Sequence, residues 1–376
     1  MTAFSVPRVV AVLAKEFTQM RRDRLTLALM LVMPLVQLLL FGYAINADPK
    51  HLPTGVLVED RGTFARSTLS ALNATGYFDI TNVARSPAEL DRLMAMGRIQ
   101  FAVTIPADFT RRVVRHDNGQ ILVEADASDP TATGGAIAAL ANLPDEALSH
   151  DLKGPLAAPP AAAPFRVVVH RRYNPESISA YNIVPGLLGV ILSMTLVMMT
   201  ALGVTREVER GTMESLLATP VRPLEVMAGK LAPYVGVGLL QAVLILTMAR
   251  ALFDVPVEGG WDALAVGLSL FIVGSLALGF LISTVAKNQL QAMQMSFFYI
   301  MPSILLSGFM FPFAGMPRWA RLIGSAIPVT HFLRVVRGAM LKGHGVLELW
   351  PSLGALGVFV LVVSTFAVVR YRTTLD

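Results

Sequence analysis

The side chains with the most obvious capacity for chemistry lie close together in one stretch, REVERGTMESLLATPVRP, at positions 206–223. Within it, Met213, Leu216 and Leu217 have the spacing of one apolar helix face. A helix capped by Thr212 and ended by Pro220 would have about two turns, too few to be stable alone in water. It must therefore pack on a membrane surface or in the groove of a soluble partner, and the flanking charges favour the partner. The candidate contact residues are Glu207, Glu209, Arg210, Gly211, Thr212, Met213, Glu214, Leu216, Leu217 and Pro220.

Catalytic chemistry is not expected in this chain. A phosphate-binding loop needs G-x-x-x-x-G-K-[ST], and the pair Gly229–Lys230 lacks both the earlier glycine and the final hydroxyl residue. The chain has no cysteine, and its six histidines are scattered. Asp126 and Asp129 provide too few oxygen ligands for a metal, so ordinary turn chemistry is the better interpretation. We expect no catalytic group, no metal and no cofactor bound by this chain.

The composition is that of a membrane protein. Of the 376 residues, 54% are hydrophobic and 15% are charged, whereas a soluble domain carries about 25% charge. The net charge of +5 can set membrane orientation, so it does not indicate a nucleic-acid partner.

Uncharged runs long enough to cross a bilayer occur six times. They are Leu25–Ile45, Ser177–Thr205, Leu231–Ala249, Ala263–Ala286, Asn288–Pro317 and Leu349–Val369. None contains an ionisable Asp, Glu, Lys or Arg, which argues against a proton-driven carrier. A shorter run, Leu322–Leu333, contains Pro328 and His331 and is expected to be interfacial or re-entrant.

The distribution of basic residues predicts that both termini are cytoplasmic. Twelve Lys and Arg residues then flank the inner ends of the runs and six flank the outer ends. The cluster at 318–342 opposes this rule. Residues 1–24 have apolar positions at helical spacing and are expected to form an amphipathic helix on the inner surface.

Residues 46–176 have a soluble composition and, from this topology, lie outside the cytoplasm. The segments PTGVLVED, RIQFAVTIP and QILVEAD are predicted strands, and ARSTLSALNA, SPAELDRLMAMG and DFTRRVVRH are predicted helices. The predicted fold class is therefore a mainly α-helical polytopic membrane protein with six transmembrane helices and an inserted α/β extracytoplasmic domain. This domain either gates or docks an envelope partner, or is a stable cap without a ligand site.

Long stretches resemble the permease subunits of type 2 ABC transporters, in the branch with a large extracytoplasmic domain. They include YNPESISAYNIVPGLLGVIL, REVERGTMESLLATPVRPLEVMAGKLAPY and SGFMFPFAGMPRWARLIGSAIPVTHFLRVVRGAMLKG, with GVLVED, ATGYFDI and IQFAVTIPADFTRRV in the outer domain. The resemblance implies that 206–223 forms a coupling helix on an ATP-binding subunit, which holds ATP and magnesium. It also implies a second, identical or similar permease copy, and a segment at about 308–345 that re-enters the membrane from outside.

The resemblance further points to the second and fifth spans as walls of a translocation pathway. Their methionines and aromatics can accept varied hydrophobic shapes, although helix packing or lipid contact accounts for about half of them. The pathway candidates are Asn182, Met194, Met198, Met295, Phe297, Phe298 and Met301. The re-entrant candidates are Gly308, Pro312, Pro317, Pro328, His331, Arg334 and Arg337; the last two contact lipid phosphates or acidic partners, or simply snorkel.

The sequence thus predicts the membrane subunit of an ATP-driven exporter in the bacterial inner membrane, moving a hydrophobic or amphipathic substrate by alternating access. Its expected partners are the ATP-binding subunit, a second permease, membrane lipid and a periplasmic adaptor protein. The alternative is a mechanotransducer that operates an envelope partner through 46–176 without moving cargo. An intramembrane enzyme is disfavoured because the catalytic groups are missing.

Overall fold

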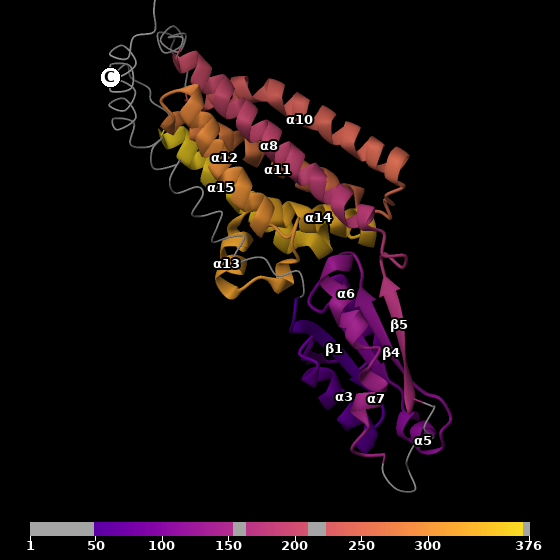
Figure 1. Cartoon of the computed structure of the whole chain (residues 1–376). Helices are drawn as coiled ribbons and strands as arrows, with labels where there is room; N and C mark the ends of the chain where they lie inside the picture. The colour runs from indigo at the N-terminus through magenta and orange to yellow at the C-terminus, as the bar shows by residue number, and fades with distance from the viewer. Residues whose placement is uncertain (1–48, 153–162, 210–222, 371–376) are drawn as a thin grey trace, which may run out of the picture.

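The computed structural model describes residues 49–152, 163–209 and 223–370, which form a sheet domain and a helical bundle (Figure 1). The sheet has five strands in the order β2-β1-β3-β4-β5. All neighbouring strands are parallel except β3 and β4, which are antiparallel. The strands are β1 (Leu52–Val58), β2 (Phe78–Val83), β3 (Phe101–Ile105), β4 (Gly119–Asp126) and β5 (Phe165–Arg172). The helices are α3 (Thr63–Ala74), α4 (Pro87–Ala95), α5 (Phe109–Val114), α6 (Pro130–Ala139) and α7 (Leu143–Ala147).

Both faces of β1 and β3 are buried, which fits the apolar residues in their sequences. On one face, residues such as Val56 and Phe101 form a core with α3, α5, α6 and α7. On the other face, Leu57 and Ala102 pack against α4. Aromatic pairs fill the larger core, with Phe78 and Phe101 edge to face at 5.0 Å.

The strands and helices that the sequence predicted coincide with β1, β3, β4, α3, α4 and α5. The structure adds α6, α7 and the two outermost strands, β2 and β5. In these outer strands only the first residue is buried, and half-buried positions alternate with exposed ones along most of the rest, so their apolar signal is weaker than that of a central strand. The predicted boundaries of this domain and its location outside the cytoplasm stay predictions.

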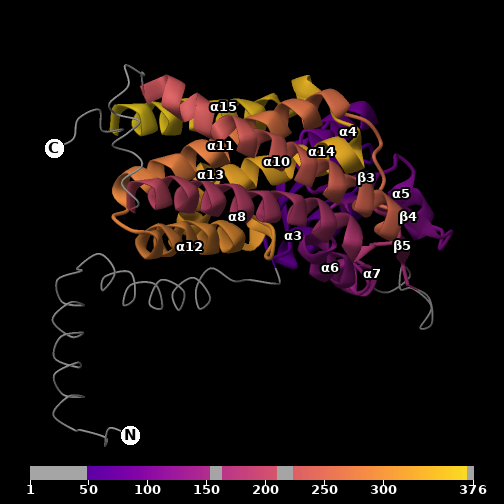
Figure 2. The ribbon, with the colours of Figure 1, turned by 90° about the horizontal axis from the view of Figure 1, so that it is seen from above.

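Among the described residues, five long helices belong to the bundle, and successive ones run in opposite directions (Figures 1 and 2). They are α8 (Ser179–Glu209), α10 (Pro223–Phe253), α11 (Trp261–Val285), α12 (Gln289–Leu306) and α15 (Val346–Arg370). A short link, residues 173–178, connects β5 to α8, so one end of the bundle adjoins the sheet domain (Figure 1). We call this the sheet-domain end, and the opposite one the far end.

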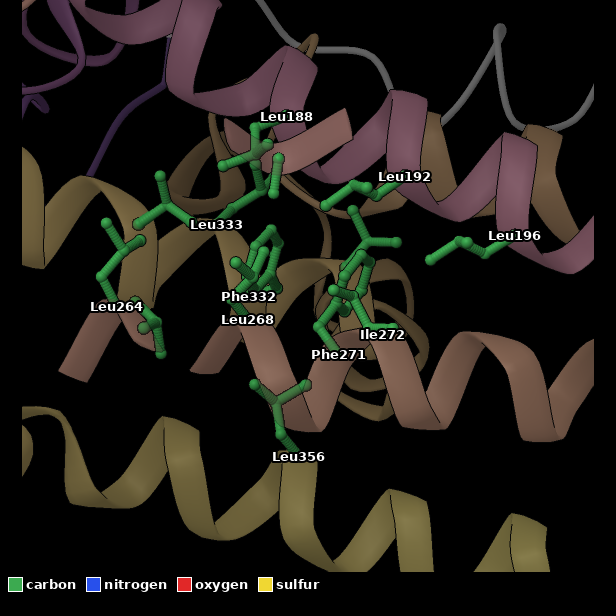
Figure 3. Packing of buried hydrophobic residues seen from close by; sticks show 14 of the residues in the cluster. Leu188, Leu192, Leu196, Leu264, Leu268, Phe271, Ile272, Phe332, Leu333 and Leu356 are labelled. Carbon is green, nitrogen blue, oxygen red and sulfur yellow. The ribbon is translucent and has the colours of Figure 1, made fainter. Parts of the chain in front are cut away.

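Helix α11 is central and packs against α8, α10, α15 and the shorter α14 (Pro328–Lys342). Figure 3 shows leucines of α8, among them Leu188 and Leu192, directed toward α11 and α14. Phe271 of α11 stacks on Phe332 of α14 with ring centroids 4.1 Å apart. Because lipid tails are as apolar as these side chains, close packing contributes more to helix association here than exclusion of water.

Four of the described helices are long and apolar enough to cross a membrane: α8, α11, α15 and Leu231–Phe253 of α10. Helix α12 is not among them, because Gln289, Gln291 and Gln294 lower its hydropathy. The structure confirms a mainly helical polytopic membrane protein with a small mixed α/β region. It does not confirm six spans, since the predicted first span, 25–45, and the predicted helix in 1–24 lie outside the described residues.

The predicted uncharged run 288–317 is divided. Helix α12 ends at Leu306, and a turn with a short 3-10 helix, η3 (Phe313–Gly315), leads to α13 (Arg318–Ala326) and α14. The apolar run 322–333 is likewise no single element, since Ile327 separates α13 from α14. The four predicted helix breakers all lie at these interruptions. Gly308 has a φ of 82° after α12, Pro312 and Pro317 precede η3 and α13, and Pro328 begins α14.

Candidate functional site

An exposed apolar surface extends along α8 and its neighbour α12. On α8 the exposed residues recur every three or four positions, and the same spacing continues on α12. The two helices pack side by side and antiparallel (Figure 2), with Glu209 at the end of α8 against Gln289 at the start of α12. The α8 stripe therefore lies toward the sheet-domain end and the α12 stripe toward the far end, and we call the two together the α8–α12 surface. Its members are Ile183, Leu187, Ile191 and Met194 of α8 and Leu290, Met293 and Phe297 of α12.

Only some of the predicted pathway residues belong to the α8–α12 surface. Met194 and Phe297 are exposed on it, and the half-buried Met198 and Met301 continue its two stripes. Met295 instead packs in a cluster with α11, and Phe298 lies off the stripe by its helical spacing. Sequence reasoning missed Leu187 and Ile191, which helical spacing from Met194 could have found.

Asn182 lies elsewhere, buried at the sheet-domain end of α8. Its side-chain amide donates a hydrogen bond of 3.1 Å to Asp129 of the sheet domain. Asp129 also caps α6 by accepting hydrogen bonds from the backbone of Thr131 and Ala132. Burial raises the pKa of Asp129 above its ordinary value, although the nearby Arg337 and the capping N–H groups oppose that shift.

A buried ion pair makes a second connection between the sheet domain and the bundle. Lys342, at the end of α14, contacts the carboxylate of Asp126 at the end of β4, and both side chains are only 9% exposed. The Lys342 ammonium also lies 4.7 Å from the ring centroid of Tyr173, in the link between β5 and α8. Asp126 accepts two further hydrogen bonds, from the backbone and hydroxyl of Ser128.

The link between β5 and α8 is itself held rigidly. Asn174 is fully buried, and its side chain both donates to and accepts from the backbone of Ile178 at 3.0 and 2.9 Å. Together with the contacts of Asp126 and Asp129, this link forms what we call the junction. Asp126 and Asp129 thus serve turns and the junction, and no group of three or more His, Asp and Glu side chains suited to a metal occurs among the described residues.

The predicted re-entrant residues on α14 differ in their exposure and contacts. The Arg337 side chain turns inward and donates to the backbone oxygens of Gly308 and Asn182, at 3.1 and 3.5 Å. Arg334 is exposed and stacks over Phe313, 4.9 Å from the ring centroid. His331 contacts the backbone oxygen of Ser325 at 2.8 Å. Of the two arginines predicted to contact phosphates or acidic partners, only Arg334 is therefore exposed to do so.

At the far end, α8 is tied to the start of α12. The Glu209 carboxylate accepts hydrogen bonds of 2.8 and 2.5 Å from the backbone and side chain of Gln289. Arg206 donates to the same glutamine at 3.3 Å. Sequence reasoning missed Gln289, because no local pattern marks a contact between residues 80 positions apart.

Most of the predicted coupling residues cannot be placed. Glu207 is half-buried and Glu209 is exposed at the end of α8. The others lie outside the described residues: Arg210, Gly211, Thr212, Met213, Glu214, Leu216, Leu217 and Pro220.

Comparison with known proteins gives a consistent result across nearly the whole chain. The family model of the ABC-2 family transporter protein matches residues 24–369. The probable multidrug ABC transporter permease YbhS of Escherichia coli K12 is 33% identical over 344 residues, covering 90% of this chain and 89% of that protein. The probable multidrug ABC transporter permease YbhR of the same organism is 25% identical over 365 residues, covering 97% and 98%.

A solved domain of an ABC type-2 transporter from Thermotoga maritima MSB8 is 19% identical, covers 32% of this chain and 84% of its own, and has a TM-score of 0.28. At that TM-score the likeness adds nothing to the assignment. Permeases of the matched family associate with an ATP-binding subunit and are not themselves catalytic. With four helices able to span a membrane among its described residues and a match over residues 24–369, this chain belongs to the ABC-2 family of transporter permeases.

Proposed function

We propose that this permease exports a hydrophobic or amphipathic substrate from the cytoplasm or inner leaflet by alternating access. A separate ATP-binding subunit supplies the energy, and a second permease copy completes the pathway. The chain lies in a bacterial inner membrane with both termini in the cytoplasm. The multidrug names of YbhS and YbhR support a drug-like or lipid-like substrate.

The α8–α12 surface is the observation that carries this proposal. It combines methionine, phenylalanine and branched aliphatic side chains, which adapt to many apolar shapes. The described part of one chain leaves it uncovered. Two copies that face each other across this surface would enclose an apolar pathway.

The contact between Glu209 and Gln289 suggests how motion reaches this surface. In the proposal, closure of the ATP-binding subunits pushes on 206–220, a stretch that begins in the last turn of α8. Because Glu209 holds the first residue of α12, α8 and α12 move together and the α8–α12 surface is displaced as a unit.

The test compares two double variants in liposomes that contain the permease and its ATP-binding subunit. Met194→Ala with Phe297→Ala removes two exposed side chains from the α8–α12 surface. Met248→Ala with Phe366→Ala removes the same residue types, also exposed, from α10 and α15. We expect the first variant to lose substrate-stimulated ATP hydrolysis and efflux severalfold for some hydrophobic dyes and not others, since a pathway wall sets specificity. Equal behaviour of the two variants would contradict the assignment of the surface.

The junction favours a second candidate, the mechanotransducer that moves the sheet domain against an envelope partner. Buried polar contacts connect the sheet domain to α8 and α14, so bundle motion would reach it directly. Blocking the α8–α12 surface with Met194→Trp separates the two candidates. If the protein is an exporter, this variant loses its function. If it is a mechanotransducer, the variant keeps its function, which is lost only when the junction is broken.

A further inference from the structure

Helix α13 exposes two chemically different sides. Ala320 and Gly324, four positions apart, are buried and face the bundle. On one side of that contact lies an apolar stripe with the spacing i, i+3, i+4, in which Trp319 is 43%, Leu322 72% and Ile323 50% exposed. The other side carries Arg318, Arg321 and Ser325, all exposed. A helix that exposes a full apolar stripe beside a cationic one has the pattern of an element lying in a membrane interface.

The cations of this region have no anionic partner in their own segment. No Asp or Glu occurs from residue 263 to residue 347. Within the described part of the chain, no ion pair or side-chain hydrogen bond is found for Arg318, Arg321 or Arg334, although Arg334 stacks on Phe313. Arg318 and Arg321 also occupy the first turns of α13, where positive charge opposes the helix dipole. They therefore do not serve the stability of the helix.

The tryptophans give the level of this helix relative to the bilayer. The chain has three, and all are exposed at the sheet-domain end. Trp261 begins α11 and Trp350 lies in the first turns of α15. Figure 1 places α13, with Trp319, beside α14 at the same end. Exposed tryptophans gathered at one end of a helical bundle mark the boundary between lipid and water.

We propose that α13 lies in the lipid–water interface nearest the sheet domain and binds anionic phospholipid there. Trp319, Leu322 and Ile323 enter the acyl region, and Arg318 and Arg321 bind the headgroup phosphates, with Arg334 adding a third positive charge. Guanidinium groups suit this role because they bind phosphate oxygens in a bidentate way. The proposal requires only that the bundle lies in a membrane, and does not depend on export.

The depth of Trp319 can be measured in the full-length chain. Trp261→Phe and Trp350→Phe leave it as the only tryptophan, and the protein is placed in nanodiscs with brominated phosphatidylcholines. We expect stronger fluorescence quenching from lipids brominated near the glycerol backbone than from those brominated near the chain end. If neither lipid quenches Trp319, protein covers this surface, and the proposal is overturned.

The phosphate contact is tested by the lipid that stays bound. The permease is placed in nanodiscs that contain both phosphatidylcholine and phosphatidylglycerol, and the nanodiscs are then dissolved. Native mass spectrometry measures which of the two lipids remains bound to the protein. Arg318→Gln with Arg321→Gln should lower the preference for phosphatidylglycerol at least about fivefold, the effect of removing one basic residue from an anionic surface. The matching variant Arg318→Lys with Arg321→Lys should keep much of the preference for phosphatidylglycerol. Arg250→Gln, an exposed arginine at the end of α10, is the control. An unchanged preference in the double glutamine variant overturns the assignment of these arginines.

Discussion

Glu209 shows how one carboxylate can serve two roles. The sequence predicts it as a contact for an ATP-binding subunit, and the structure shows it bound within the chain to both polar groups of Gln289. It also lies at the N-terminal end of α12, where a negative charge is favourable. Glu209 therefore positions α12 relative to α8, whatever it contacts outside the chain.

This contact predicts a charge-repair experiment. Gln289→Glu places a second carboxylate against Glu209, so repulsion should detach α12 from α8 and lower the substrate moved per ATP severalfold. Adding Glu209→Gln restores the pairing of one carboxylate with one amide, and should restore most of the coupling. The measurement is efflux against ATP hydrolysis in liposomes. A double variant no better than Gln289→Glu alone would show that the contact does not carry the motion.

At the scale of elements, glycine decides how closely α8 and α11 approach. A Cβ atom built on Gly279 would lie 2.5 Å from the backbone oxygen of Val197. That distance is far inside van der Waals contact, and the neighbour is backbone, which cannot rotate away. The two helices can be this close only because α11 has no side chain at this position, as is common between membrane helices.

Gly279→Ala should therefore lower the thermal stability of the bundle, at a cost of about 1–3 kcal/mol for overpacking. Gly354→Ala is the matched control, because a Cβ atom at this position of α15 meets nothing within 4 Å. It should leave the unfolding midpoint in detergent unchanged or raise it slightly, since alanine favours the helix. Equal unfolding midpoints for the two variants would mean that α8 and α11 can move apart without loss of thermal stability.

For the whole molecule, the junction determines whether the sheet domain and the bundle move together. Its contacts come from five separate places: the end of β4, the start of α6, the link between β5 and α8, the first turn of α8 and the end of α14. A buried ion pair such as that of Asp126 and Lys342 is weak evidence for stability, but separating its two members would leave an uncompensated buried charge. We therefore expect the two parts to form one stiff body.

The absence of cysteine makes this expectation measurable with spin labels. One label on the exposed Arg115 of the sheet domain and one on the exposed Arg250 of α10 should give a narrow distance distribution. Lys342→Gln leaves the Asp126 carboxylate buried without its cation, and should broaden the distribution. Adding Asp126→Asn removes the stranded charge and should narrow it again. A distance distribution that stays narrow in Lys342→Gln would show that the remaining junction contacts are enough to hold the sheet domain against the bundle.

The sequence alone allowed prediction of much of the fold, because its strongest signals are local. Uncharged runs indicate α8, α10, α11 and α15, and turn residues such as Gly308 and Pro328 lie at helix interruptions. The family resemblance was also carried by continuous stretches, and the family model confirms it. Edge strands β2 and β5 were missed because only the first residue of each is buried, so they carry little apolar signal.

What only the tertiary structure decided is which distant residues meet and which face of each helix remains uncovered. Lys342 and Asp126 are 216 positions apart, and no local period relates them. Met295 and Phe297 look alike in sequence, yet one packs against α11 and the other is exposed. Periodicity depends on the backbone geometry of a single element, so a short stretch of sequence contains it. Burial and pairing depend on how several elements pack at once, and this chain settles them only when it is folded.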